Sequence, residues 1–330
     1  MPDDSTLRQL EEQLLGGRRT LTLGQLAERI GAPVAPVQRF WEALGMPVTD
    51  PDAADFTEED ARVLCLLFGA AERSGMARGG LVSLERSVGH HAERMATWQA
   101  ETLVEHYAEH HGLDDVSARL VLLDRMRLVA PILEEQLLHA WRRHMAALTA
   151  RVASEFSDVT DVPTDALPLA RSVGFADMVS FTVRTASMLP VELARFVRDF
   201  EEGATSIVTG NGGRVVKTIG AAGLFASDDP RSGAEIAMRL AETFGAASPT
   251  PVRVGFVWGR VLSRFGDVYG ASVNTAARLT DEAVPGTVLT DPPTAALLTG
   301  QGFVLEEEDE REVAGLGPVA PFRVVARPAG

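Results

Sequence analysis

The sequence predicts an α+β protein in two parts, an all-α first half and a second half in which strands and helices alternate. Apolar residues recur at three- and four-residue spacing almost throughout residues 1–157, which is the period of an amphipathic helix. After residue 168, short β-type runs alternate with helical ones, as expected for helices packed on a sheet. A length of 330 residues also favours two domains.

The boundary between the halves is marked by composition. The stretch SDVTDVPTDALPLA is rich in Asp, Thr and Pro, which predicts a linker at residues 158–168. We therefore expect an all-helical domain at 1–157 and a mixed α/β domain at 169–330. Within the first domain, the long apolar periodicity of residues 114–156 predicts a single long helix.

Bulk composition narrows the class of protein. Apolar content of 45% with 23% charged residues is typical of a globular chain, and the single cysteine, Cys65, excludes a disulfide framework. No run approaches about 20 uninterrupted apolar residues, and the polar, acidic start is unlike a secretory signal. We expect no membrane span and a cytoplasmic location. A net charge of −15 argues against a dedicated nucleic-acid binder but allows a nucleotide substrate.

The second half contains four stretches that carry chemistry. Asp177 ends an apolar strand in VGFADMVSFT, at a place suited to a metal ligand, and free amides just after it can hold phosphate oxygens. Lys217 lies inside the apolar hairpin VVKTIGAAGLF, and Asp267 lies between glycines in RFGDVYG. Asn274 and Arg278 are four residues apart, on one helix face. Taken singly, each feature is more typical of a cap or a surface ion pair.

Together, in this order, the four stretches resemble the class III nucleotidyl cyclases over roughly residues 170–327. The resemblance implies a ferredoxin-like α/β sandwich that converts ATP to cyclic AMP and pyrophosphate. It implies that Lys217 and Asp267 read adenine, that Asn274 orients the ribose, and that Arg278 takes up charge in the transition state. It also implies Asp177 as a ligand of two Mg²⁺ or Mn²⁺ ions. The implied phosphate-binding loop consists of Met178, Val179, Ser180, Phe181 and Thr182.

Adenine reading by a lysine and an aspartate is chemically reasonable. The lysine can donate to a ring nitrogen and the aspartate can accept from the exocyclic amine, whereas guanine presents the opposite pattern. The family forms its sites across a dimer interface, with metal ligands from one chain and the Lys/Asp/Asn/Arg set from the other. The resemblance thus implies a homodimer with two shared sites.

One position departs from the family pattern. The second metal aspartate directly follows the glycine of KTIG, where this chain has Ala221. Asp228 and Asp229 follow about seven residues later, beyond the next strand, and are poor substitutes. Loss of one of two carboxylates predicts weakened metal binding and a loss of turnover on the order of 10²-fold or more. Alternatives are an inactive, nucleotide-binding pseudo-cyclase that regulates a partner, and a heterodimer with a complete cyclase chain.

The helical half offers two hypotheses. Residues of about 20–70 resemble a MerR-type helix-turn-helix, but the expected recognition helix APVQRFWEALG has one arginine, Arg39, so we expect protein packing rather than DNA reading. A DNA-binding regulator remains the alternative. All histidines lie in this half, and such a cluster can bias a conformational equilibrium as pH falls. They are His90, His91, His106, His110, His111, His139 and His144. The layout of this half is similar to that of acid-sensing bacterial adenylyl cyclases, and the alternative is a solvated helix face.

Overall fold

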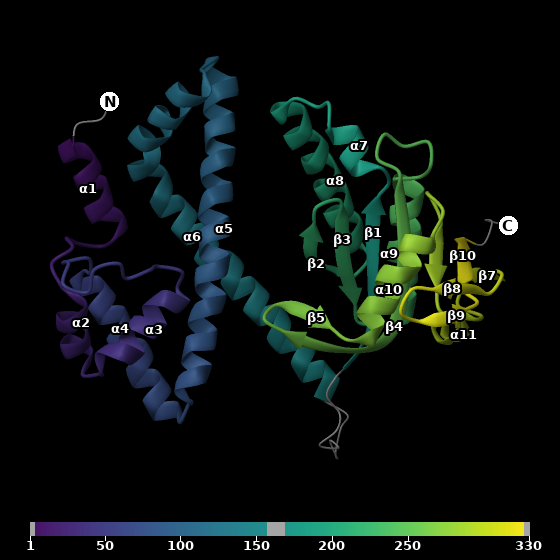
Figure 1. Cartoon of the computed structure of the whole chain (residues 1–330), viewed down its shortest axis with the longest axis horizontal. Coiled ribbons are helices and arrows are strands. Elements are labelled where there is room, and N and C mark those ends of the chain that lie inside the picture. The colour runs from purple at the N-terminus through teal and green to yellow at the C-terminus, as the bar shows by residue number, and fades with distance from the viewer. Residues whose placement is uncertain (1–3, 157–168, 327–330) are drawn as a thin grey trace. The chain divides into compact units, whose positions relative to one another are not determined.

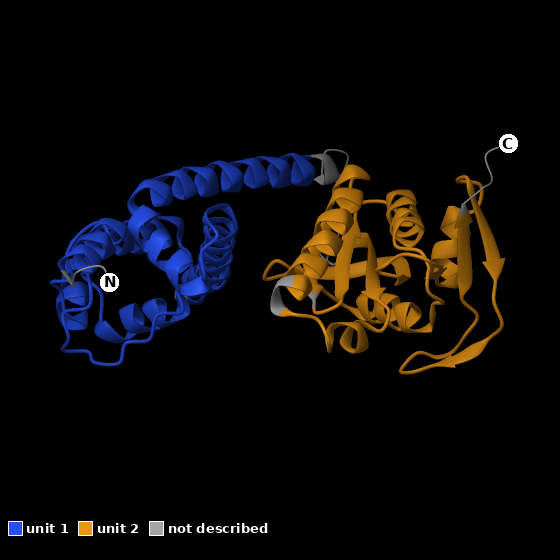
Figure 2. Ribbon diagram, turned by 90° about the horizontal axis from the view of Figure 1, so that it is seen from above, with its two compact units in different colours: residues 1–159 blue, residues 160–330 orange. Residues whose placement is uncertain are grey.

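The computed structural model describes residues 4–156 and 169–326 (Figure 1). The chain divides into two compact units, residues 1–159 and 160–330 (Figure 2). The linker predicted at 158–168 lies outside the described residues. No helix in the described part of the chain is long and apolar enough to cross a membrane.

Unit 1 is helical, as the sequence predicts. Its helices are α1 (Asp4–Leu14), α2 (Leu23–Ile30), α3 (Val34–Ala43), α4 (Glu58–Ser74), α5 (Arg78–His111) and α6 (Asp115–Phe156). Helix α6 corresponds to the long apolar periodicity of the sequence. Helix α5 has 34 residues and was not delimited by the sequence pattern. An unbroken helix of this length contacts its neighbours on changing faces, so it shows no single apolar stripe.

Two capping boxes define the compact part of unit 1. Thr22 caps α2 and Thr57 caps α4, each accepting from the backbone amide three residues on. Asp60 completes the second box, in the acidic first turn that the sequence indicates as a helix start. Behind these caps, α2, α3 and α4 enclose a small core that includes Leu26 and Phe40. The helix-turn-helix region therefore has a core of its own.

The C-terminal half of α6 leaves large apolar side chains exposed. Leu138, Trp141, Met145 and Leu148 are 41%, 58%, 42% and 47% exposed. Their spacing of three, four and three residues places them along one helix face. No packing within unit 1 covers this face in the described residues. We call these four residues the α6 seam.

Unit 2 is built on a mixed sheet with the strand order β2-β3-β1-β4-β6-β10-β7, and β5 pairs with β4. Neighbours run antiparallel except β4 and β6, which are parallel. The strands are β1 (Leu169–Met178), β2 (Arg214–Ile219), β3 (Ala222–Ser227), β4 (Val252–Arg264), β5 (Asp267–Tyr269), β6 (Val288–Thr290), β7 (Phe303–Glu307) and β10 (Phe322–Ala326). A separate ribbon pairs β8 (Arg311–Val313) with β9 (Gly317–Val319).

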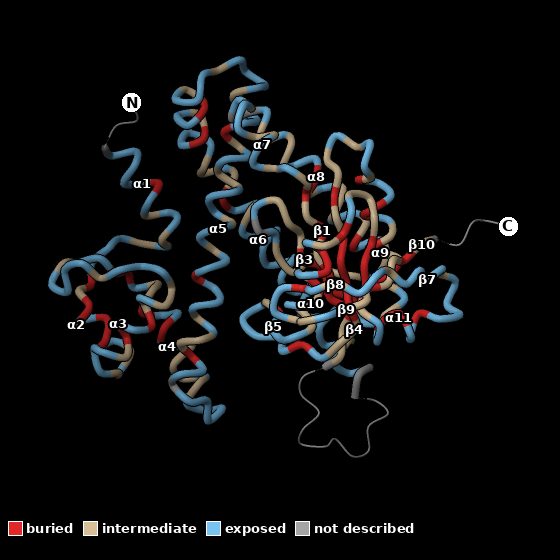
Figure 3. The backbone as a smooth tube through the Cα atoms, turned by 45° about the vertical axis from the view of Figure 1, so that its right-hand side comes forward, coloured by how far each residue is buried: buried red, intermediate tan, exposed pale blue. Residues whose placement is uncertain are grey.

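Helices cover both faces of this sheet, which gives the α/β sandwich that the sequence predicts. They are α7 (Phe181–Thr185), α8 (Pro190–Gly210), α9 (Pro230–Thr243), α10 (Ala271–Glu282) and α11 (Pro292–Leu298). One core lies between the sheet and α8 and α9, and includes Phe225 and Phe256. The other lies under α10 and includes Val173, Leu224 and Leu279. Figure 3 shows that the central strands of unit 2 are largely buried. Their burial holds in place the strand ends on which the candidate site lies.

Candidate functional site

A β-bulge determines where Lys217 points. Val215 of β2 pairs with Phe225 of β3, yet Lys217 pairs with Leu224, so Val216 is an extra residue in the ladder. Phe225 and Leu224 belong to opposite cores, and Val215 packs on the same side as Phe225. Without the bulge, Lys217 would share the face of Val215. The bulge therefore turns Lys217 onto the α10 side of the sheet.

On that side Lys217 meets Asp267. The Lys217 ammonium donates a hydrogen bond to the Asp267 carboxylate, although the two residues are 50 positions apart in sequence. Asp267 begins β5 after a two-residue turn, Phe265 and Gly266, both with positive φ (56° and 75°). This is the turn geometry that matches the twist of a hairpin. Two separate hairpins thus bring together the two residues that the sequence assigns to adenine.

The charge state of Asp267 follows from these contacts. Partial burial acts to raise the pKa of Asp267. Hydrogen bonds from Lys217 and from the Val268 amide (2.8 Å), together with the charge of Lys217, outweigh burial and hold this pKa below its usual value. Asp267 is therefore an anion at neutral pH and acts as a hydrogen-bond acceptor.

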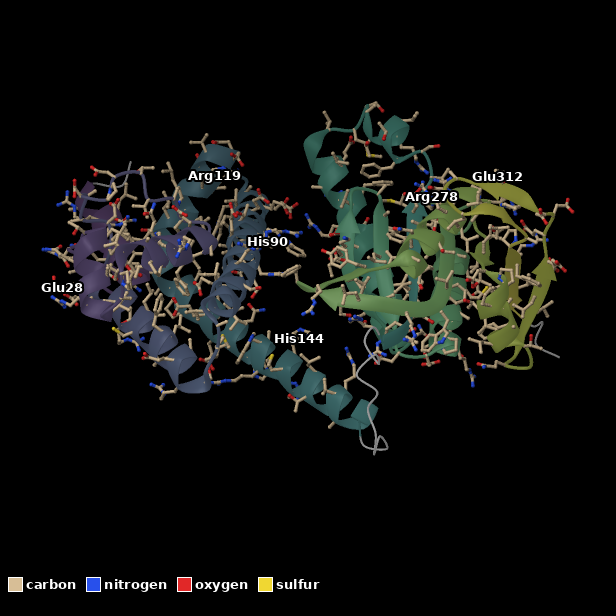
Figure 4. All side chains as sticks on the ribbon, turned by 60° about the horizontal axis from the view of Figure 1, so that its bottom comes forward. Glu28, His90, Arg119, His144, Arg278 and Glu312 are labelled. Atoms are coloured by element: carbon tan, nitrogen blue, oxygen red, sulfur yellow. The ribbon has the colours of Figure 1, made fainter. Side chains whose placement is uncertain are left out.

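Helix α10 carries Asn274 and Arg278 one turn apart, and both are exposed; Arg278 is labelled in Figure 4. Arg278 Nη1 donates to Asp281 Oδ2 at 3.4 Å, and the Arg278 side chain is 52% exposed. Close packing of α10 on β4 depends on Gly255, since a Cβ there would lie 2.4 Å from the Thr280 amide nitrogen. Asn274 and Arg278 are therefore held rigidly at the backbone while their side chains remain accessible.

Asp177 lies near the end of β1, as the sequence predicts, but it has a partner that the sequence reasoning missed. Its Oδ2 accepts a hydrogen bond from Arg253 Nη2 at 2.7 Å. Asp177 pairs directly with Arg253 on β4 and with Ala222 on β3, so all three lie on one face. Arg253 is a basic residue in the apolar run VRVGFVWG, the same signal that singled out Lys217.

The residues around Asp177 do not fit a two-metal site. Ala221 is adjacent, because its carbonyl accepts from the Met178 amide at 3.0 Å, but it supplies no side-chain ligand. Asp229 caps α9 and Asp228 pairs with Arg171 at 3.1 Å, at the opposite end of β1. Within residues 4–156 and 169–326, no three His, Cys, Asp or Glu side chains gather as a metal cluster. Asp177, the carboxylate expected to bind metal, is itself paired with an arginine.

Backbone hydrogen bonds leave only some amides of the predicted phosphate-binding loop available to a ligand. The Met178 amide donates to Ala221 and the Val179 amide donates to Pro251 O at 2.8 Å, so neither is available to a ligand. Ser180 adopts a left-handed conformation (φ 57°) and precedes the short helix α7. The first amides of a helix have no partner within it. Ser180, Phe181 and Thr182 therefore remain as donors.

The predicted histidine set lies on α5 and α6, with His90 and His144 labelled in Figure 4. All seven side chains are exposed. The rings of His106 and His110 stack at 5.6 Å between centroids, and those of His110 and His111 lie 4.9 Å apart. The first contact joins neighbouring turns of α5 and the second joins adjacent residues, and the histidines form no metal cluster among the described residues.

The recognition helix of the expected helix-turn-helix corresponds to α3. Arg39 is exposed on it, and Gln38 is engaged with Glu42 at 2.9 Å. A base-reading helix needs several side chains free to enter the major groove. Helix α3 therefore has few free polar side chains with which to read bases.

Comparison with known proteins extends over both units. Residues 170–325 match the family described as the adenylate and guanylate cyclase catalytic domain. An adenylate cyclase of Glutamicibacter nicotianae is 37% identical over 97% of this chain and 82% of its own length. One from Streptomyces coelicolor is 32% identical over 99% and 92%.

Two further similarities are more distant. A pH-sensitive adenylate cyclase of Mycobacterium tuberculosis is 28% identical, over 91% of this chain and 77% of its own length. Among solved structures, the catalytic core of a rhodopsin-guanylyl cyclase with converted specificity, in complex with ATPαS, is 25% identical with a TM-score of 0.45. That match covers 48% of this chain and 97% of the other.

Proposed function

Because this chain belongs to the adenylate and guanylate cyclase family, we propose that it is a cytoplasmic adenylyl cyclase homologue. It binds ATP and forms cyclic AMP and pyrophosphate, with turnover impaired by Ala221 and controlled by the helical unit. The adenylate cyclases to which it is 37% and 32% identical over almost the whole chain support this reaction.

The observation that carries the choice of ATP is the pairing of Lys217 with Asp267. The pair presents one donor and one acceptor side by side. The lowered pKa of Asp267 keeps it an acceptor, which suits the adenine amine and not the guanine carbonyl. GTP would leave both partly buried partners mismatched, and such mismatches discriminate against the competing base.

The proposed reaction is an in-line attack of the ribose 3′-hydroxyl on the α-phosphorus, with pyrophosphate leaving. Asn274 hydrogen-bonds the ribose and holds the hydroxyl in line. The Arg278 guanidinium neutralises charge that develops on the reacting phosphoryl group, and the amides of Ser180, Phe181 and Thr182 hold phosphate oxygens. Class III cyclases generally use two divalent metal ions. With one carboxylate present, we expect the Mg²⁺ or Mn²⁺ requirement of this chain to be poorly met.

The test is cyclic AMP production from Mn·ATP by the chain and by Ala221→Asp. The Ala221 backbone lies next to β1, since its carbonyl accepts from the Met178 amide, and position 221 is where the family pattern has its second metal aspartate. We expect a rise of about 10²-fold or more. Ala296→Asp, which adds the same charge at an exposed position of α11, is the control and should give no rise. Equal, negligible turnover in all three chains, with ATP still bound, would favour the pseudo-cyclase.

We further propose that two copies form shared sites, with Asp177 of one chain facing the Lys217, Asp267, Asn274 and Arg278 set of the other. The α6 seam supports a second copy, because its spacing is that of a coiled coil. The alternative is a heterodimer in which a complete cyclase chain supplies the metal ligands. Sedimentation of the purified chain separates the two, since only the first predicts a dimer without a partner.

Control of activity by pH is a second proposal for the helical unit. The stacked rings of His106 and His110, with His111 in the same helical end, support it, because protonation would place like charges close together. Glu105 and Glu109 lie in the same turns and would oppose that repulsion. A relative described as pH-sensitive aligns over 91% of this chain. Replacing all three histidines by Gln should flatten the pH response of Ala221→Asp activity, and an unchanged response would exclude this set.

A further inference from the structure

The ion pair between Asp177 and Arg253 lies where a metal ligand is expected. The side chains are 26% and 28% exposed, so water screens the pair less than it would at the surface. Their Cα atoms are paired directly across β1 and β4, and the Nη2–Oδ2 distance is 2.7 Å. The geometry is therefore set by the sheet register and does not depend on a flexible loop.

The other contacts of Arg253 hold its guanidinium in place. Nη1 donates to the Asp281 carbonyl at the end of α10, at 2.9 Å. Nε is buried and has no hydrogen-bond partner in the part of the chain that the structure describes. An arginine with an unpaired buried donor already bears a desolvation cost, and losing its carboxylate would raise that cost further. Asp177 is therefore strongly retained by Arg253.

We propose that Arg253 competes with divalent cations for Asp177, so that Arg253 and Ala221 together keep this end of the sheet closed to metal. A carboxylate whose charge is compensated by a fixed guanidinium attracts a second cation weakly. With Ala221 in place, one negative and one positive group leave the position with no net charge. The inference rests on the proposed function only for the expectation that Asp177 is the metal ligand.

The consequence is a specific order of metal affinities. Removing the guanidinium leaves Asp177 uncompensated, and Asp at 221 restores the second carboxylate of the family pattern. We expect the weakest Mn²⁺ binding from the chain as it is and the tightest from Ala221→Asp combined with Arg253→Gln. The two single variants lie between them. The gain from Arg253→Gln in the Ala221→Asp background should be roughly five- to thirty-fold.

The experiment is a Mn²⁺ titration of the full chain without nucleotide, following free Mn²⁺ by electron paramagnetic resonance. Adding Asp177→Asn to the double variant should abolish the gain, which assigns the bound ion to this site. Arg171→Gln is the matched control, because Arg171 pairs with Asp228 at the far end of the same strand. Its affinity for Mn²⁺ should stay unchanged.

Equal Mn²⁺ affinity of Ala221→Asp with and without Arg253→Gln would overturn the proposal. Arg253→Lys separates charge from structure, because a lysine keeps the competing charge and should keep binding weak. A gain with lysine equal to that with glutamine would also overturn it, since loosened structure rather than lost charge would then explain both. The titration does not depend on cyclic AMP production. The predicted order of Mn²⁺ affinities can therefore hold even if the chain is not a cyclase, and the chain can be a cyclase even if this order fails.

Discussion

At the scale of single residues, the Lys217–Asp267 pair predicts a pH-dependent contribution to stability. The folded chain lowers the pKa of Asp267, so the pair stabilises the fold above the unfolded pKa, about 3.9, and loses that effect as pH falls through the lowered value. Asp267→Asn should therefore lower the free energy of unfolding at pH 7 by at most about 1 kcal/mol, since the Lys217 side chain is 38% exposed.

The measurement is the urea midpoint of both chains between pH 7 and pH 3. The difference should shrink towards zero as pH falls below about 4. Asp309→Asn, which removes an equal charge from an exposed position, should show no such trend. A difference that stays constant down to pH 3 would mean that Asp267 has an ordinary pKa, against the interpretation of the site.

At the scale of secondary-structure elements, the register of β2 against β3 predicts the effect of moving the lysine by one position. Exchanging Lys217 and Thr218 keeps the composition but places the lysine opposite Gly223, on the other face of the sheet from Asp267. ATP affinity should fall on the order of tenfold or more, since a hydrogen bond to a charged group is lost. Val216→Ala leaves Lys217 in its register and should bind nearly normally. ATP titration by calorimetry checks both, and equal affinities would show that the strand register does not aim the lysine.

The packing of α10 on β4 gives a second prediction at this scale. Gly255→Ala places a Cβ 2.4 Å from the Thr280 amide nitrogen, so α10 must shift, and we expect a loss of about 1–3 kcal/mol of stability. Gly223→Ala on β3 meets nothing within 4 Å and serves as the control. The urea midpoints of Gly255→Ala and Gly223→Ala test this prediction. Equal midpoints would mean that α10 can shift without loss of stability.

Elements were more predictable than the contacts between them. The spacing of apolar residues and the turn residues located β1, the β2–β3 hairpin and α10. The order of the motifs then singled out the candidate site residues Asp177, Lys217, Asp267, Asn274 and Arg278. The bulge was not predictable, because it depends on how β2 aligns with β3. Arg253 was missed for the same reason, since it meets Asp177 through a register between strands 76 residues apart. Short β5 was missed because three residues carry too little periodicity.

At the scale of the whole molecule, a shared site predicts recovery of activity by mixing two inactive chains. In the Ala221→Asp background, Asp177→Asn removes the metal carboxylate and Arg278→Ala removes the transition-state arginine. Each double variant alone should lose about 10²-fold or more of the turnover. In a mixed dimer, one of the two sites receives an intact Asp177 from one chain and an intact Arg278 from the other.

The expected recovery follows from the fraction of mixed dimers and the number of intact sites in each. Random exchange makes half of the dimers mixed, each with one intact site of two, so the mixture should reach about a quarter of the Ala221→Asp turnover. Mixing each variant with its own kind is the control and should give nothing. No recovery, with exchange demonstrated by differently tagged chains, would mean that each chain builds its site alone. Asp177 would then work with the α10 face of its own unit, on which Arg253 already connects it to Asp281.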